Sequence, residues 1–533
     1  MIAGQRPKLL PHGRLVALRT RGVTAVALLA LVAVLLQPAV AQAHAMLKSS
    51  NPPAGARLTT VPQSIRLMFT ESPDLTFTRI ELFDAGDASV TLGTVGYAPD
   101  SKRAVLVAIR GALDAGVYTV VWQTAGDDGH PTHGQFSFTI APGASGTGRA
   151  TTGGEAAGGV TAPGQLPPAR THHAGTSMPG ENSFGAASPL YVAIRWLQFA
   201  ALLTVVGAVV FRLVVLGFMA RERAPRLTLI AHAATGAARL GFVGVTLLGI
   251  AALLRLGAQS YAMHGAANVW DIALVGSMLG KTVWGWAWLL QLAGIVGAFV
   301  GFARARHSSE ARPFGGWVLA LLSVAVLAFT PAVSGHAVSA PRLMGLAVLA
   351  DGLHVIGAGG WLGSLLFVLA VGIPTALRLE ADERGPAVAD LVDAFSPTAL
   401  AFAGATATTG VFAAWLHLGT VRALWETAYG QTLLVKLAVL SIVAATGAYN
   451  WLRVRPALGD IEGARRVRRS ATVEIAVGVL VLAVTAVLVA MPTAADEVAM
   501  SAPAVASTRA CPASFAASRC PVADSPSSSR PST

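Results

Sequence analysis

The chain of 533 residues is 53% hydrophobic and only 12% charged. Soluble domains carry about 25% charged residues, so this composition excludes an ordinary soluble protein and indicates a membrane protein. The net charge of +12 does not indicate nucleic-acid binding, because lysine and arginine concentrate between apolar segments, where they control membrane topology.

Residues 1–43 have the pattern of a signal peptide. A basic lead precedes an apolar run from Val23 to Leu36, and Ala41 and Ala43 supply a small-residue cleavage pattern. Cleavage after Ala43 makes His44 the first residue of the mature protein. Its amine and imidazole nitrogens can chelate one metal ion, which suits Cu(II). The alternative is a histidine that merely follows the cleavage point.

Residues 44–141 are predicted to form an all-β sandwich of the cupredoxin or immunoglobulin-like type. Apolar and polar residues alternate in several short segments, and turn residues separate those segments. The expected strands are 64–69, 77–83, 118–122 and 135–140. Residues 142–186 are rich in Gly, Ala, Thr and Pro, which favours a flexible linker.

Residues 187–492 are predicted to form an all-α transmembrane bundle of eight helices, so the fold class is mixed. Each hydrophobic segment is long enough to cross a bilayer. The expected spans are 190–218, 229–256, 274–303, 315–335, 345–373, 395–418, 431–452 and 471–491.

Arginine concentrates in alternate loops between these spans, which predicts the topology. The chain is expected to be a multi-pass plasma-membrane protein. Its N-terminal domain and its C-terminal tail, residues 493–533, then lie on the exported side. The tail has the composition of a disordered segment and contains Cys511 and Cys520. On the exported side these cysteines are in an oxidising compartment, where they can form a disulfide.

An internal partner for His44 lies in the segment Asp127–Gly134. On extended backbone, residues two apart project to the same side, so Asp128 and His130 can point together at one metal ion. With His44 they supply three nitrogens and one oxygen, a donor set for Cu(II). Asp127 and His133 are either outer groups of this site or solvated loop residues.

These segments resemble the CopC family of exported copper-binding proteins. The matching stretches are His44-Ala-Met-Leu-Lys-Ser-Ser-Asn-Pro-Pro-Ala-Gly55, Phe69-Thr-Glu71, Asp128-Gly-His130-Pro131 and Gly134-x-Phe136-x-Phe138. In that family the N-terminal histidine and the Asp-x-His pair bind Cu(II). The resemblance therefore implies copper-ligand roles for His44, Asp128 and His130. It implies no methionine-rich Cu(I) site in this domain, which holds only Met46 and Met68.

Residues 190–491 are similar to the CopD family. The matching stretches are Ser334-Gly-His336-Ala337, His354 with Trp361-Leu-Gly363, Phe395-Ser-Pro397, Thr409-Gly410, Tyr429-Gly430 with Lys436, Tyr449-Asn450 and Glu474. The order CopC, linker, CopD matches fusions associated with copper uptake and homeostasis. The resemblance therefore implies a copper transport protein rather than an enzyme.

Four histidines are candidates for a copper path in the membrane domain: His264, His336, His354 and His417. The expected topology places three of them at exported span ends and His354 about two turns inside its span. Ionisable groups within a membrane are functional candidates, although each histidine can instead cap a helix or bind a carbonyl.

Three further residues extend this set. Met263 beside His264 adds a soft ligand and favours Cu(I) in the membrane domain. Lys436 and Glu474 are expected to form a buried ion pair that is either structural or relays protons.

The leading hypothesis is copper import, in which the exported domain binds Cu(II) and hands copper to the membrane domain. The partners are then copper ion and the lipid bilayer, together with a membrane oligomer and without nucleic acid. The chain contains no G-x-x-x-x-G-K-[ST] loop for binding nucleotide phosphates, so we expect that this chain does not itself drive copper transport with ATP. The alternatives are copper sequestration without transport and a haem- or copper-dependent membrane oxidoreductase.

Overall fold

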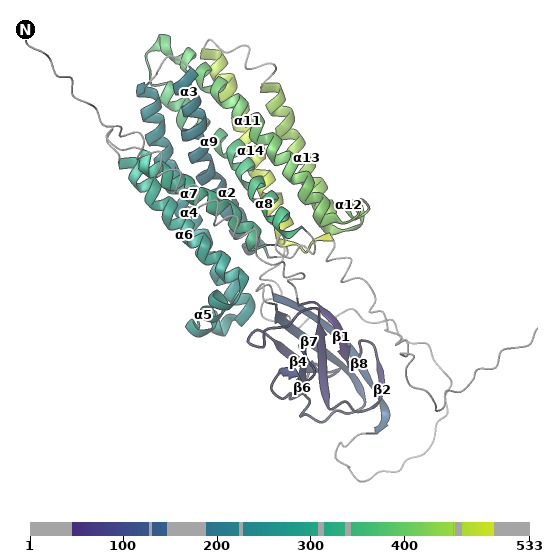
Figure 1. Cartoon of the computed structure of the whole chain (residues 1–533). Coiled ribbons are helices and arrows are strands. Elements are labelled where there is room, and N and C mark those ends of the chain that lie inside the picture. Colours follow the sequence, from purple (N-terminus) through teal and green to yellow (C-terminus); the bar gives the residue numbers. More distant parts are fainter. Residues whose placement is uncertain are drawn as a thin grey trace, which may run out of the picture.

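The computed structural model describes residues 45–126, 131–145, 188–222, 227–307, 314–335, 343–450, 452 and 461–494. A β domain is followed by a helical domain, and the β domain lies beside one end of the helices (Figure 1). We call this end of the bundle the β-domain end. The expected mixed fold class is confirmed.

The β domain is a sandwich of two four-stranded sheets, with strand orders β1-β3-β6-β5 and β2-β8-β7-β4. Neighbouring strands are antiparallel except for the parallel pair β2 and β8. The strands are β1 (Leu47–Asn51), β2 (Arg57–Thr60), β3 (Ser64–Phe69), β4 (Arg79–Phe83), β5 (Gly96–Ala98), β6 (Ser101–Ala108), β7 (Gly116–Ala125) and β8 (Pro131–Ser145).

Alternating side chains of both sheets form one apolar core, which needs no disulfide. At its centre Trp122 packs edge-on against Phe69, with ring centroids 5.3 Å apart. A Cβ on Gly134 would lie 2.7 Å from the Trp122 ring, so the glycine leaves room for the indole. β3 matches its predicted bounds, whereas β8 extends four residues beyond the predicted domain end at 141.

The helical domain contains eight helices that are long and apolar enough to span a membrane within the described residues, as expected. Its elements are α2 (Pro189–Val210), η1 (Phe211–Val215), α3 (Leu216–Glu222), α4 (Leu227–His264), η2 (Ala266–Asn268), α5 (Ile272–Lys281), α6 (Val283–His307), α7 (Phe314–Val333), α8 (Met344–Ala358), η3 (Gly359–Gly363), α9 (Ser364–Phe367), η4 (Val368–Gly372), α10 (Ile373–Ala376), α11 (Ala381–Leu418), α12 (Ala423–Glu426), α13 (Ala428–Tyr449) and α14 (Ile461–Ala490).

The third and sixth spans differ from their predicted bounds. The third was expected to begin at 274, but the chain leaves the helical conformation at Thr282, so α5 is a separate short helix. The sixth begins at Ala381 rather than at 395. In the third span the apolar composition continues across the helix boundary at Thr282, and in the sixth span the helix begins before the apolar stretch does. Apolar composition therefore does not mark these boundaries.

The helical domain consists of two halves that repeat one order of elements. The first half runs from α2 to α7 and the second from α8 to α14. Each half begins with a span of 33 residues, which contains π-helical turns, and continues with a span of 38 residues. A short helix, α5 or α12, then precedes the third span. Since four spans separate equivalent elements, the halves are repeats that cross the membrane in the same direction.

The halves also share the connection between the short helix and the third span. Thr282 Oγ1 donates a hydrogen bond to Met278 O (2.7 Å) and accepts one from Gly285 N (2.9 Å). Thr427 makes the same two bonds, at 2.6 and 3.0 Å, with the carbonyl four residues before it and the amide three residues after it. In each half one threonine closes the short helix and caps the next.

The first spans of the two halves cross at a pair of glycines. A Cβ on Gly207 would collide with the carbonyl carbon of Gly363, and a Cβ on Gly363 would collide with Leu203 O. The backbones therefore touch, and no residue larger than glycine fits. The two glycines occupy nearly the same position in their spans. Equivalent positions of two repeats contact each other where a pseudo-two-fold axis passes between them. The axis therefore passes through this pair of glycines.

Candidate metal centre and domain junction

The predicted Cu(II) ligands His44, Asp128 and His130 lie outside the described residues. The structure does bring together residues that lie next to them in the chain. Thr132 Oγ1 donates a hydrogen bond to Ala45 O (2.8 Å), and Ala45 is fully buried in the core of the sandwich. The chain segment that follows His44 is therefore joined to the one that follows His130.

The structure describes one of the two further candidates around this site. His133 is exposed on β8, where it stands opposite Gln123 of β7. Asp127 lies outside the described residues. The exposure of His133 favours the interpretation as a solvated residue.

The β domain contacts the helical domain at the last turn of α4. The final carbonyls of an α-helix have no partner within the helix. Two of them accept hydrogen bonds from the β domain: Gln123 Nε2 donates to Ala262 O (2.8 Å), and Arg79 Nη2 donates to His264 O (2.9 Å). Arg79 and Gln123 are cross-strand neighbours on β4 and β7. The arginine also places a cation at the negative end of the helix dipole.

Next to these bonds, side chains of both domains form an apolar cluster that we call the junction. It consists of Phe77, Ala125, Met263, Met278, Trp284 and Trp288, all buried. The first two belong to the β domain and the other four to α4, α5 and α6. Figure 1 shows the β domain beside α5 at this end of the bundle. The two domains thus share buried apolar surface, which favours a docked arrangement.

His264 lies at the junction with one ring nitrogen unpartnered. It is 2% exposed, and its ring centroid is 5.6 Å from that of Phe77. Ser260 Oγ donates its single proton to Val269 O (2.6 Å), so it accepts from His264 Nδ1 at 3.1 Å. His264 Nε2 has no hydrogen-bond partner. In the neutral ring the proton is thus on Nδ1, and Nε2 carries the lone pair that can bind a metal.

His354 lies in α8, in the second half. Its Nδ1 is 3.1 Å from Thr409 Oγ1 of α11. The charge of Lys436 on α13 acts on His354 and on Asp351. Asp351 is absent from the residues predicted from the sequence. The signal was available, because an acidic residue three positions before His354 in an apolar span shares its helix face.

The other predicted histidines do not join these two in one cluster. The ring of His417, at the end of α11, lies 6.4 Å from the ring of Tyr429. His336 lies outside the described residues. Among the described His, Cys, Asp and Glu side chains, no group of three or more is placed to hold a metal ion. A copper path through the four histidines stays a prediction.

The predicted ion pair between Lys436 and Glu474 is wrong. Glu474 Oε1 accepts a hydrogen bond from Asn450 Nδ2 (2.9 Å), whereas the charge of Lys436 interacts with Asp351. Lys436 and Asn450 are separated by about 21 Å along α13, given the rise of an α-helix. Glu474 is therefore at a different depth from Lys436.

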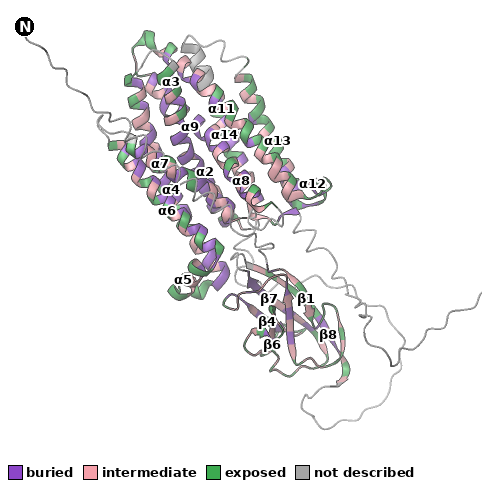
Figure 2. Cartoon of the chain, viewed as in Figure 1, coloured by how far each residue is buried: buried purple, intermediate pink, exposed green. Residues whose placement is uncertain are grey.

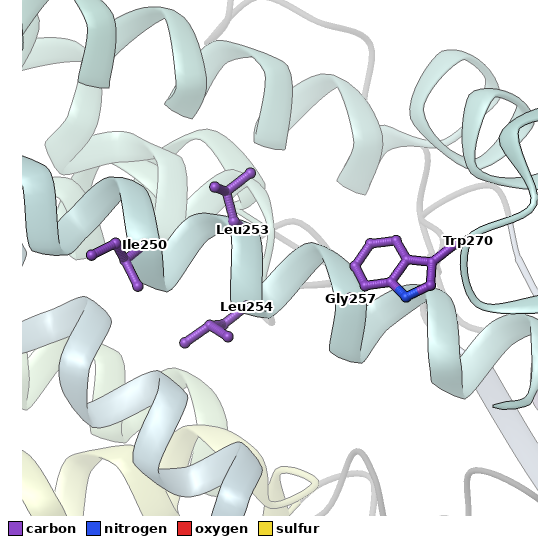
Figure 3. A pocket seen from close by; sticks show the side chains of 5 residues that line it. All are labelled: Ile250, Leu253, Leu254, Gly257 and Trp270. Carbon is purple, nitrogen blue, oxygen red and sulfur yellow. The ribbon is translucent and has the colours of Figure 1, made fainter.

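A surface pocket on α4 is not a metal site. It is lined by Ile250, Leu253, Leu254, Gly257 and Trp270, so it offers no metal-binding side chain (Figure 3). Trp270 is 69% exposed, and its ring covers Gly257. Exposed tryptophans are common at the ends of membrane helices, where they lie at the lipid–water interface. The pocket therefore belongs to the surface that faces lipid.

Three family models match successive parts of the chain. The CopC domain matches residues 47–141. The N-terminal domain of copper resistance protein D-like proteins matches residues 186–346, and the model of copper resistance protein D matches residues 389–488. The first match covers the β domain. The other two begin in the first and second halves of the helical domain.

Proteins of known name resemble the whole chain or its parts. Copper transport protein CutJ of Bacillus subtilis is 24% identical over 462 residues, which are 86% of this chain and 75% of CutJ. Copper resistance protein D of Pseudomonas syringae is 27% identical over 56% of this chain and 95% of its own length. Copper resistance protein C of Escherichia coli is 32% identical over 19% of this chain and 83% of its own length.

Proposed function

Because the chain belongs to the copper resistance and copper transport family, as a CopC domain fused to a CopD membrane domain, we propose that it imports copper. The β domain, on the exported side of the plasma membrane, binds Cu(II) through His44, Asp128 and His130. It then passes copper to the helical domain, which carries it into the cytoplasm.

The observation that supports this proposal is the short stretch of chain between the junction and one of the predicted ligands. Ala125 is part of the junction, and Asp128 follows it by three residues in the chain. Three residues of extended chain span at most about 11 Å. This short connection supports a transfer of copper from Asp128 to the last turn of α4.

Within the helical domain, His264, His336, His354 and His417 are the proposed copper path. His264 supports the first step, because it is buried against the β domain and its Nε2 is unpartnered. His354 supports a later step, because it lies inside a span and faces Thr409. Copper in this domain is proposed to travel as Cu(I), which imidazole and thioether ligands accept.

The test is total cell copper at limiting external copper. Cells with the intact chain are compared with cells that lack it and with cells that carry His44→Ala or Asp128→Ala. We expect each ligand variant to lower chain-dependent accumulation to near the level without the chain. His133→Ala is the matched control, since His133 is an exposed histidine on β8 close to the same segment, and it should accumulate copper normally.

Two outcomes contradict import. Greater tolerance to excess copper with unchanged cytoplasmic copper would show sequestration instead. A Soret absorption band in the purified protein would show bound haem and support an oxidoreductase. The abundance of the chain in the membrane is measured in every strain, so that a variant that is poorly expressed is not mistaken for one that has lost transport.

A further inference from the structure

The junction contains more metal-binding chemistry than apolar packing requires. Met263 and Met278 are 1% and 0% exposed there, and His264 lies against Phe77 of the same cluster. Thioether sulfur and imidazole nitrogen are ligands that suit Cu(I). Resting on the proposed function, we infer that His264, Met263 and Met278 form a binding site for a soft monovalent metal ion, Cu(I). The β domain closes this site with Phe77.

The state of His264 supports a metal rather than a hydrogen-bond partner at Nε2. A buried acceptor without a partner costs about 1–3 kcal/mol, and a bound metal ion satisfies it. The bonds from Nδ1 to Ser260 and from Ser260 to Val269 fix the ring in its orientation. Metal-binding histidines are commonly held by such a bond from the other ring nitrogen.

The second half shows that the scaffold does not need a methionine at position 278. Thr427 makes with Ala423 the bond that Thr282 makes with Met278. Alanine therefore serves the helix cap as well as methionine does. The equivalent cluster in the second half contains Ala423, Tyr429 and Leu433, and it is closed by Leu488 of α14 and by Ala494 just beyond that helix. Methionine at this position thus occurs in the half on which the β domain docks.

Arg79 gives the site a dependence on docking. Its guanidinium binds His264 O, and its charge acts on the His264 side chain. A metal cation on Nε2 and the Arg79 cation repel each other, so metal binding weakens docking and docking weakens metal binding by the same factor. Copper arriving at His264 therefore favours release of the β domain.

The test is a titration of the purified full chain with Ag(I), a soft monovalent ion that needs no reductant. Met263→Leu/Met278→Leu conserves side-chain volume and removes both sulfurs. His264→Asn keeps a donor near the position of Nδ1 and removes Nε2. We expect each variant to lower the affinity of one Ag(I) site by about 100-fold or more, since losing even an outer partner costs 10–100-fold.

Two controls separate binding from folding. Met219→Leu replaces a methionine that is equally buried, at 1% exposure, away from the junction, and should leave Ag(I) binding unchanged. Thermal unfolding of each variant verifies that the chain remains folded. Arg79→Gln retains a donor for His264 O and removes the charge, so we expect tighter Ag(I) binding, a result that a purely packing role of these side chains does not produce.

Unchanged Ag(I) binding in both ligand variants would overturn the site. If copper accumulation in cells still depends on His44 and Asp128 in that case, import stands without this site. If Ag(I) binding falls as expected but no cell accumulates copper, the site stands and import fails.

Discussion

The two halves of the helical domain share one plan but differ in how much of each span is covered. In the first half, 44% of the most apolar stretch is buried in both the second and the third span, whereas the figures are 6% and 11% in the second half. Figure 2 shows α13, the third span of the second half, mostly in the green and pink of exposed and intermediate residues. The repeated arrangement of helices therefore does not require these spans to be covered, and the second half leaves most of their apolar stretches exposed.

The polar residues of the two halves differ as well. Lys436 of the second half occupies the position in α13 that the buried Gln291 occupies in α6. Asp351 and His354 accompany Lys436, and the first half instead carries the docked β domain. The two halves thus repeat one arrangement of helices, but one half receives the β domain and buries Arg195 and Arg255, whereas the other carries Asp351, His354 and Lys436.

The largest effect should come from the glycines of the shared connection. A Cβ on Gly285 would collide with Met278 O, and one on Gly430 would collide with Ala423 O. Because backbone atoms cannot move aside, Gly285→Ala or Gly430→Ala should lower the free energy of unfolding by more than about 3 kcal/mol. Equilibrium denaturation of the full chain in mixed micelles measures it.

Gly276→Ala is the matched control, since this glycine of α5 has open space around it. Alanine there should stabilise the helix by up to about 1 kcal/mol. A severe effect of Gly285→Ala together with a mild effect of Gly430→Ala would break the equivalence of the two halves.

The next effect concerns Lys436, whose charge is replaced by the neutral Gln291 at the equivalent position of the first half. Lys436→Gln installs the residue type of the first half and leaves Asp351 without its cation, which should destabilise the chain by about 3 kcal/mol. Adding Asp351→Asn should restore most of that loss, because the unpaired charge is then gone. The same denaturation measurement applies, with Lys281→Gln on the surface of α5 as control. Equal losses of unfolding free energy in the single and double variants would show that Lys436 and Asp351 do not interact.

A smaller effect is expected from the capping threonines. Thr282→Val and Thr427→Val keep the shape of the side chain and remove its hydroxyl. Each substitution should lower the free energy of unfolding by about 1–2 kcal/mol, the usual contribution of a helix N-cap. The loss should be nearly equal in the two halves. Hydrogen exchange of the first turns of α6 and α13 locates the loss. Exchange that rises in only one of the two helices contradicts a shared connection.

The smallest effect tests the docked β domain, which only the first half has. Gln123→Ala removes the bond to Ala262 O and should weaken docking by about 1 kcal/mol. Distances between spin labels on β2 and α6 measure the docked fraction. The control is Thr119→Ala, which removes an exposed hydroxyl on the same strand, β7. Identical distance distributions in Gln123→Ala and the intact chain would show that this bond does not hold the domains together.

Much of the fold could be predicted from the sequence, because its signals are local. Ser64–Phe69 alternates residue by residue and forms β3 with those bounds. Eight apolar segments predict eight spans, and eight are present in the described residues. Alternation and hydropathy report on the surroundings of neighbouring residues, and the surroundings of a span or a strand are uniform along its length.

The site could be predicted only in part, because its contacts join distant segments. No local pattern connects Arg79 with His264, or Thr132 with Ala45. The internal repeat was also not apparent, since it lies in cap geometry: Thr282 and Thr427 share a role, while most residues around them differ. The ion pair predicted for Lys436 failed because charge and span number do not report depth.

The crossing of Gly207 and Gly363 has a consequence for permeation. In many assemblies related by symmetry, the pore follows the symmetry axis. Here the backbones of the two first spans touch at the pseudo-axis, so no lumen exists there for an ion to pass. Any conduit must run off the axis, so the proposed path from His264 in the first half to His354 in the second must pass to one side of this crossing. Such a path begins at His264 beneath the docked β domain and continues into the half that carries Asp351 and Lys436.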